Sequence, residues 1–216
     1  MIALSTHTSM TFGDEARGAL LAGTTALADA VRPTLGPRSR AVLIGRQWGS
    51  PLVCDDGVTI ARQFKLEDAA QDIGAQLLKQ AAMRTGDAVG DGTTTATLLA
   101  HAIVAEGIRN VVVGTSAVDI KRGLDRGLAI ARDALVAMSR PVHGRADMVH
   151  VAAVSAHGDQ TVGELVADAV EKVGEEGVIE VEEAKGIETT LDVVEGMQLD
   201  QGYLSAYFVT DPERME

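Results

Sequence analysis

Hydrophobic residues recur every three or four positions in five stretches of the chain, and this spacing predicts five α-helices. The predicted helices cover residues 16–31, 66–85, 94–106, 116–139 and 161–173. Pro33 is predicted to end the first helix, and Gly86 and Gly107 the second and third, because both residue types terminate helices. Ser116 and Asp119 fit the spacing of a capping box at the start of the fourth.

The fourth predicted helix carries a continuous apolar face, which we expect to be buried. Its members are Ile120, Leu124, Leu128, Ala131, Leu135 and Met138. The charged residues of this helix fall between them. The periodicity therefore predicts a helix that packs one side against the rest of its domain.

Four shorter segments have a strand pattern. Residues 41–44 and 51–54 are apolar runs with a polar, glycine-containing link, which predicts a β-hairpin. Residues 178–182 and 191–195 alternate between apolar and polar side chains, as half-buried strands do. A proline-containing stretch at 141–145 separates the helical part from this mixed part. The sequence therefore predicts a mainly α domain followed by a smaller α/β part.

Composition and charge exclude several function classes. The net charge is −12 over 216 residues, and residues 159–200 alone hold 13 acidic and 2 basic side chains. No basic stripe is present, so we expect no nucleic-acid partner. No apolar run approaches the ~18 residues of a membrane span, so we expect no membrane partner. Cys54 is the only cysteine, so no disulfide can form within the chain, which suits a reducing cytoplasm.

The most informative motif is Gly-Asp-Gly-Thr-Thr-Thr-Ala-Thr at residues 90–97. Threonine is a poor helix former, so three consecutive threonines are unfavourable inside a helix. They fit a helix N-terminus, where free N–H groups bind anions. Gly90 and Gly92 would let the backbone approach a ligand closely. Asp91 could ligate Mg²⁺ shared with phosphates. A threonine-rich helix cap beside an ordinary aspartate turn explains the same residues, and both interpretations stay open on this motif alone. No Walker A lysine is present.

Two further loops end predicted elements. Thr34-Leu35-Gly36-Pro37 follows the first helix, and residues 55–57 (Asp-Asp-Gly) follow the hairpin. Each is an ordinary turn sequence by itself. Together with residues 90–97 they could place backbone donors, a metal carboxylate and a second carboxylate around one triphosphate.

These motifs and several others follow one another in a fixed order from about Met10 onward. The others include Asp-Ile-Lys-Arg-Gly at 119–123, Gly-Glu-Glu-Gly-Val-Ile at 174–179 and Gly-Tyr-Leu-Ser at 202–205. The series closely resembles the group I, bacterial GroEL-type chaperonins. The resemblance implies the N-terminal half of an equatorial ATPase domain at 1–140 and the first half of an intermediate domain at 141–194. It also implies the start of an apical domain at 195–216, with the chain ending before the molecule is complete.

The resemblance also implies the site residues. Nucleotide binding would fall to Thr34, Leu35, Gly36, Pro37, Asp55, Asp91, Gly92, Thr93, Thr94 and Thr95. Asp91 would ligate Mg²⁺, K⁺ is a further candidate ion, and the catalytic Asp56 would position or activate the attacking water. Asp55 stands where the family usually has lysine. Polypeptide binding would fall to Tyr203, Tyr207 and Phe208, for which a place in the apical core is the alternative.

The resemblance implies ATP-dependent folding and refolding of proteins, and enzymes with this activity are classed as isomerases. The implied partners are other copies of the subunit in a double ring, a co-chaperonin and unfolded client proteins, in the cytoplasm. The family's second catalytic carboxylate lies outside these residues, so we expect little ATPase activity from the 216-residue chain alone. The alternatives are a non-catalytic chaperonin fragment and a sugar kinase of the actin fold with an Asp-x-Gly-Thr-Thr phosphate loop.

Overall fold

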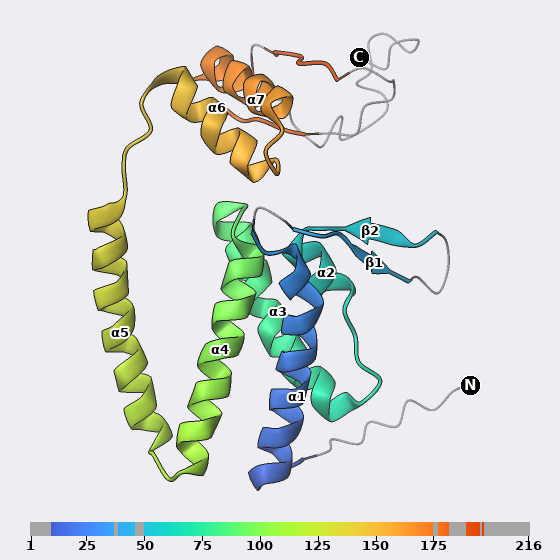
Figure 1. Cartoon of the computed structure of the whole chain (residues 1–216), viewed down its shortest axis with the longest axis vertical. Coiled ribbons are helices and arrows are strands. Elements are labelled where there is room, and N and C mark those ends of the chain that lie inside the picture. The colour runs from blue at the N-terminus through green and yellow to red at the C-terminus, as the bar shows by residue number, and fades with distance from the viewer. Residues whose placement is uncertain are drawn as a thin grey trace, which may run out of the picture. The chain divides into compact units, whose positions relative to one another are not determined.

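The computed structural model describes residues 10–36, 39–45, 50–174, 177–181, 189–194 and 196. Contacts divide the chain into two compact units, Met1–Ser139 and Arg140–Glu216, and each is described by itself. The division lies next to the boundary predicted at 141–145. The described residues are mainly helical with one small sheet, as the sequence predicts (Figure 1).

The first unit is built around three long helices that pack side by side. They are α1 (Gly13–Val31), α3 (Ala69–Val89) and α4 (Thr93–Val112), and the short helix α2 (Gly57–Gln63) packs against all three (Figure 1). The helices α1 and α3 approach closely because each carries a glycine at the crossing. A Cβ atom at Gly23 would lie 1.8 Å from Gln71 O, and one at Gly74 would lie 2.3 Å from Leu20 O.

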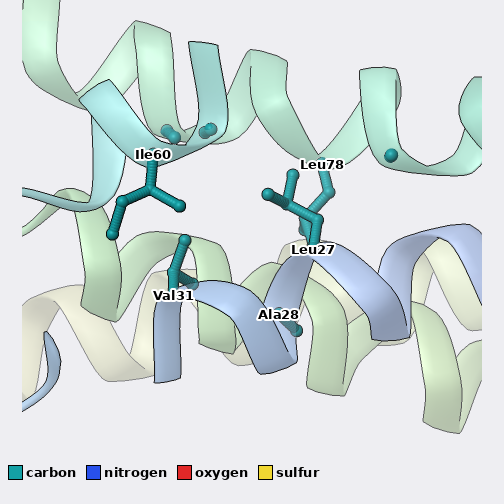
Figure 2. Close-up of a cluster of buried hydrophobic side chains, with 8 residues drawn as sticks. Leu27, Ala28, Val31, Ile60 and Leu78 are labelled. Carbon is teal, nitrogen blue, oxygen red and sulfur yellow. The ribbon is translucent and has the colours of Figure 1, made fainter. Parts of the chain in front are cut away.

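The core of this unit lies between α1, α2 and α3. Leu27 and Val31 of α1 point toward Leu78 of α3 and Ile60 of α2, and Ala28 of α1 belongs to the same buried cluster (Figure 2). All five are at most 3% exposed. The side chains are aliphatic and small, in keeping with the scarcity of aromatic residues. The last turn of α1 and the middle of α2 are therefore held by buried apolar contacts.

The predicted hairpin is confirmed. Strands β1 (Val42–Ile44) and β2 (Leu52–Cys54) are antiparallel, with Val42 opposite Cys54 and Ile44 opposite Leu52. Val42, Ile44 and Cys54 pack partly buried against the core. A short three-residue η1 helix (Arg32–Thr34) connects α1 to the residues before the hairpin.

Two predicted helix ends were wrong. The helix α3 runs through Gly86 to Val89 and ends at Gly90, which adopts the left-handed conformation at φ 75°. The helix α4 likewise continues through Gly107 to Val112. An internal glycine costs a helix only about 1 kcal/mol, so it ends a helix only where the backbone must also turn left-handed.

The prediction that the apolar face of the fourth helix is buried was also wrong. The helix is α5 (Ala117–Met138), and no residue of it is buried within the described part of the chain. Leu128 is 69% exposed and Leu135 63% exposed. Ser116 occupies the N-cap, but its side chain makes no capping hydrogen bond, so the predicted capping box does not form. Periodicity shows which face a helix would bury, not whether a partner covers it.

The second unit contains α6 (Gly144–Ser155), which the sequence did not predict, and α7 (Gln160–Val173), which it did. They pack together closely, because a Cβ atom at Gly163 would lie 2.9 Å from the Ala153 Cβ. Arg145 Nη2 lies 2.5 Å from Asp168 Oδ1 across the pair. Contact with the Asp168 carboxylate raises the pKa of Arg145 above its ordinary value.

The strands predicted at 178–182 and 191–195 were wrong for the residues that the structure describes. Residues 177–181 and 191–194 have no strand conformation. Alternation predicts a half-buried surface, but a strand also requires a hydrogen-bonded neighbour. Within the described ranges, the only paired strands are β1 and β2.

Candidate functional site

The residues after β2 start a helix instead of the predicted turn. Asp56 is the N-cap of α2, and its carboxylate accepts hydrogen bonds from Val58 N at 3.2 Å and Thr59 N at 3.0 Å. Thr59 Oγ1 donates a third at 2.6 Å. An aspartate N-cap satisfies N–H groups that otherwise lack a partner in the first turn. The N–H groups of Val58 and Thr59 in the first turn of α2 thus already have the N-cap carboxylate as their acceptor.

A fourth hydrogen bond connects Asp56 to a distant helix. Thr93 Oγ1, in the first turn of α4, donates to Asp56 Oδ1 at 3.3 Å. Burial raises the pKa of the Asp56 carboxyl, but the hydrogen bonds from Thr59, Val58 and Thr93 together outweigh this effect and hold the pKa below its ordinary value of 3.8. Asp56 is therefore ionised at neutral pH.

The junction between α3 and α4 leaves the start of α4 open. Gly90 and Gly92 both have a φ of 75°, which favours glycine and reverses the chain within three residues. Gly92 is the N-cap of α4 and has no side chain, so no side-chain cap fills the first turn. Asp91 lies between the two glycines, and its Oδ1 accepts from Gly92 N at 2.5 Å. A carboxylate thus lies beside a helix N-terminus that has no side-chain cap.

The η1 helix contacts the first turn of α4 as well. Thr34 Oγ1 lies 2.9 Å from Thr94 Oγ1 and donates to Val31 O at 2.9 Å. Thr34 is 6% exposed, and Val31 belongs to the core in Figure 2. The loop after α1 is therefore attached to both the core and the first turn of α4.

Gly57 explains how the two helix starts come so close. A Cβ atom there would lie 2.4 Å from Thr94 Oγ1 and 2.9 Å from Thr94 N. No other residue has room at this position. The first turns of α2 and α4 therefore meet at a contact that only glycine allows.

The structure brings together part of the predicted set. Hydrogen bonds join Thr34 to Thr94 and Asp56 to Thr93, while Asp91 and Gly92 directly precede these threonines. Leu35, Gly36, Asp55 and Thr95 are exposed beside them. The roles of all these residues stay predictions. Pro37, Tyr203, Tyr207 and Phe208 lie outside the described residues.

The sequence missed two members of this cluster. Thr59 gives Asp56 its shortest hydrogen bond, and Gly57 makes the helix contact possible. The signal was present, because Asp-x-x-Thr is the spacing of an N-cap and its third helical residue. The stretch was interpreted as a turn because Asp-Gly is also a common turn sequence.

No group of three or more His, Cys, Asp or Glu side chains among the described residues could hold a metal ion. No helix among these residues is long and apolar enough to cross a membrane.

Comparison with known proteins gives a consistent picture. The TCP-1/cpn60 chaperonin family matches residues 27–216. Chaperonin GroEL 5 of Bradyrhizobium diazoefficiens is 60% identical over 210 residues, which are 97% of this chain and 39% of that protein. The chain thus spans about two fifths of this relative's length.

Solved structures show the same likeness. A group III chaperonin in the open state is 29% identical with a TM-score of 0.61, over 73% of this chain and 32% of that one. The chaperonin gp146 from the bacteriophage EL 2, in the presence of ATP-BeFx, is 26% identical with a TM-score of 0.62 over 72% and 28%. The family match covers most of the chain, and the chain therefore belongs to the TCP-1/cpn60 chaperonin family.

Proposed function

We propose that the cluster of Thr34, Asp56 and residues 91–95 binds the phosphates of Mg-ATP in an ATP-dependent chaperonin subunit. One observation carries this proposal. Two helix N-termini meet at Gly57, and the start of α2 is filled by Asp56 while the start of α4 has no side-chain cap. The start of α4 can therefore receive an anion from outside the chain.

The phosphate would lie at the first turn of α4. Backbone N–H groups there carry the positive end of the helix dipole, and left-handed glycines let a ligand approach the backbone. Asp56 draws the side-chain hydroxyl of Thr93 away toward α2. The exposed Thr95 is then the member of the threonine run that is best placed to donate to a phosphate oxygen.

Asp91 fits a magnesium ligand. Its carboxylate stands one residue before the N-cap of α4, beside the proposed phosphate position. Mg²⁺ commonly uses one or two protein carboxylates together with phosphate oxygens and water. Mg²⁺ held there would neutralise charge on the phosphates.

Asp56 is suited to orienting a water rather than taking its proton. Its low pKa makes it a weak base, and its two oxygens already accept four hydrogen bonds. To hold a water it has to release one of them, and the bond from Thr93 is the longest at 3.3 Å. Orienting a water would therefore loosen the connection from α2 to α4, while Asp56 keeps its hydrogen bonds as the N-cap of α2.

The whole protein's properties are part of the same proposal. We infer an ATPase-driven double ring of identical subunits that receives unfolded proteins and a co-chaperonin, promotes refolding and works in the cytoplasm. The domain halves at 1–140 and 141–194, and the apical start at 195–216, belong to this inference. A sugar kinase is not favoured, because residues 93–112 form a long helix and not a strand of an early hairpin.

The test uses a chimaera in which this chain replaces the matching part of Chaperonin GroEL 5. Mg-ATP binding is measured by titration calorimetry, for the chimaera and for its Asp91→Ala variant. We expect Asp91→Ala to weaken Mg-ATP binding and to lower ATP hydrolysis about a hundredfold or more, while binding in EDTA changes little. The control is Asp87→Ala, an exposed carboxylate in the last turn of α3. Equal behaviour of the two variants would refute the nucleotide site.

A further inference from the structure

Three aspartates cap helices with their side chains in the described part of the chain, and one of them holds its carboxylate differently. Asp68 and Asp159 each accept both N–H groups of the first turn on one oxygen, Oδ1, at 2.8 to 3.2 Å. Asp56 divides them, because Oδ1 accepts from Val58 N at 3.2 Å while Oδ2 accepts from Thr59 N at 3.0 Å. The two oxygens of Asp56 therefore face different neighbours.

The third residue of α2 explains this difference. Thr59 Oγ1 donates to Asp56 Oδ2 at 2.6 Å, the shortest of the hydrogen bonds to this carboxylate. At the equivalent position α7 has Val162, which has no side-chain donor, and α3 has Gln71, whose Nε2 lies 3.5 Å from Asp68 Oδ2. Thr59 thus binds Oδ2 with both its backbone and its side chain, and so turns the carboxylate into the divided arrangement.

The two oxygens of Asp56 differ in what they can release. An ionised carboxylate offers about four acceptor positions, two on each oxygen. Thr59 fills both positions of Oδ2 with bonds of 2.6 and 3.0 Å, while Oδ1 has longer bonds of 3.2 Å from Val58 N and 3.3 Å from Thr93 Oγ1. A water therefore replaces a donor most easily at Oδ1. Oδ1 is also the oxygen that contacts α4, where the phosphate is proposed to bind.

We propose that Thr59 is a positioning residue for ATP hydrolysis, which fixes Oδ2 of Asp56 so that Oδ1 is the oxygen that orients the attacking water. This role rests on the proposed nucleotide site. Thr59 acts only through Asp56, because its hydroxyl proton is committed to that carboxylate. Without the hydroxyl, the carboxylate is free to adopt the single-oxygen cap of Asp68 and Asp159, and the oxygen toward α4 loses its fixed direction.

The charge state of Asp56 depends on the same bond. Burial raises the pKa of the Asp56 carboxyl, and the hydrogen bond from the Thr59 hydroxyl is the strongest of those that lower it. Among the donors around Asp56, Thr59 is therefore the one that stabilises its ionised form most.

The experiment compares variants of the chimaera. Thr59→Val removes the hydroxyl at nearly constant shape, and Thr59→Ser keeps a hydroxyl. Thr85→Val is the matched control, because Thr85 is also a half-buried helical threonine, and its hydroxyl donates to Ala81 O at 2.9 Å. Single-turnover hydrolysis of Mg-ATP gives the rate of the chemical step, and titration calorimetry gives the dissociation constant of Mg-ATP and the fraction of subunits that bind it.

We expect Thr59→Val to slow hydrolysis about three- to tenfold, the effect of one hydrogen bond, while the dissociation constant of Mg-ATP stays within about twofold. Thr59→Ser should restore most of the rate, and Thr85→Val should leave it unchanged. In the Asp56→Ala background Thr59→Val should slow hydrolysis no further, because the side chain that Thr59 positions is gone. A purely structural defect would instead lower the fraction of subunits that bind Mg-ATP and would persist in that background.

A second substitution keeps the test decisive if Thr59→Val folds poorly. Thr59→Ala also removes the hydroxyl, and alanine is the better helix former, so it should show the same loss of rate in a stable helix. The role of Thr59 is overturned by an unchanged rate in the variant that folds, by Thr59→Ser as slow as Thr59→Val, or by a further loss in the Asp56→Ala background. Failure of the nucleotide site itself is recognised separately, because Asp91→Ala would then leave Mg-ATP binding unchanged.

Discussion

Asp56 accepts a hydrogen bond from Thr93 Oγ1 at 3.3 Å, across 37 positions of sequence, and so joins the first turn of α2 to the first turn of α4. The same carboxylate caps α2 through Val58 N and Thr59 N. One side chain thus serves as a helix cap and as a connection to the proposed phosphate position. These two roles can be separated by substitution.

Asp56→Ala should destabilise the 216-residue chain by about 0.5–2 kcal/mol, because an N-cap is lost. Asp68→Ala is the matched control, since Asp68 caps α3 through Ala70 N at 2.8 Å and Gln71 N at 3.1 Å but is exposed. Urea unfolding should report a loss for both, and a larger one for Asp56→Ala because its bond to Thr93 is lost as well. In the chimaera only Asp56→Ala should lower the rate of ATP hydrolysis, by about tenfold or more. Equal hydrolysis in the two variants would argue that Asp56 is a cap and nothing else.

The lowered pKa of Asp56 predicts an acid-dependent stability. A group with a depressed folded-state pKa contributes its full stabilisation above its unfolded-state value, near 3.8, and loses it as pH falls through the lower folded-state pKa. The free energy of unfolding of the chain, measured in urea between about pH 2 and pH 6, should therefore fall below pH 4. Asp56→Asn keeps a good N-cap but cannot titrate, so its curve should be flatter there. An identical slope in both proteins would contradict the assigned pKa direction.

Gly57→Ala tests the close contact between the two helix starts. The added Cβ would meet Thr94 Oγ1 at 2.4 Å, so we expect a loss of about 1–3 kcal/mol in urea unfolding and weaker Mg-ATP binding in the chimaera. Gly107→Ala is the control, because no atom lies within 4 Å of its added Cβ. It should stabilise α4 by about 0.5–1 kcal/mol. A stabilising Gly57→Ala would show that α2 and α4 do not meet as described.

The sequence predicted the long helices and the hairpin because their periodicity is local. It could not place helix ends at Gly90 and beyond Gly107, since a glycine ends a helix only through the backbone conformation that tertiary contacts impose. The site loops were found by their residue types. The hydrogen bonds that connect these loops were not found, because the bond from Thr93 to Asp56 and the bond between Thr94 and Thr34 depend on packing between distant segments.

The uncovered face of α5 gives a prediction for the chain alone. Leu128 is 69% exposed while Leu27 is fully buried. Leu128→Gln should change the stability of the 216-residue chain by less than about 0.5 kcal/mol and reduce its self-association in light scattering. Leu27→Ala should cost about 2–5 kcal/mol. If Leu128→Gln destabilises the chain as strongly as Leu27→Ala, α5 is buried against another element.

The most direct measurement is the structure of the chimaera with Mg-ADP and beryllium fluoride. We expect phosphate or fluoride atoms about 3 Å from the N–H groups in the first turn of α4. We also expect Mg²⁺ about 2.1 Å from an Asp91 carboxylate oxygen, with the Asp56 carboxylate facing the beryllium. Nucleotide bound elsewhere, or phosphates at α4 with Mg²⁺ away from Asp91, would contradict the proposed nucleotide site.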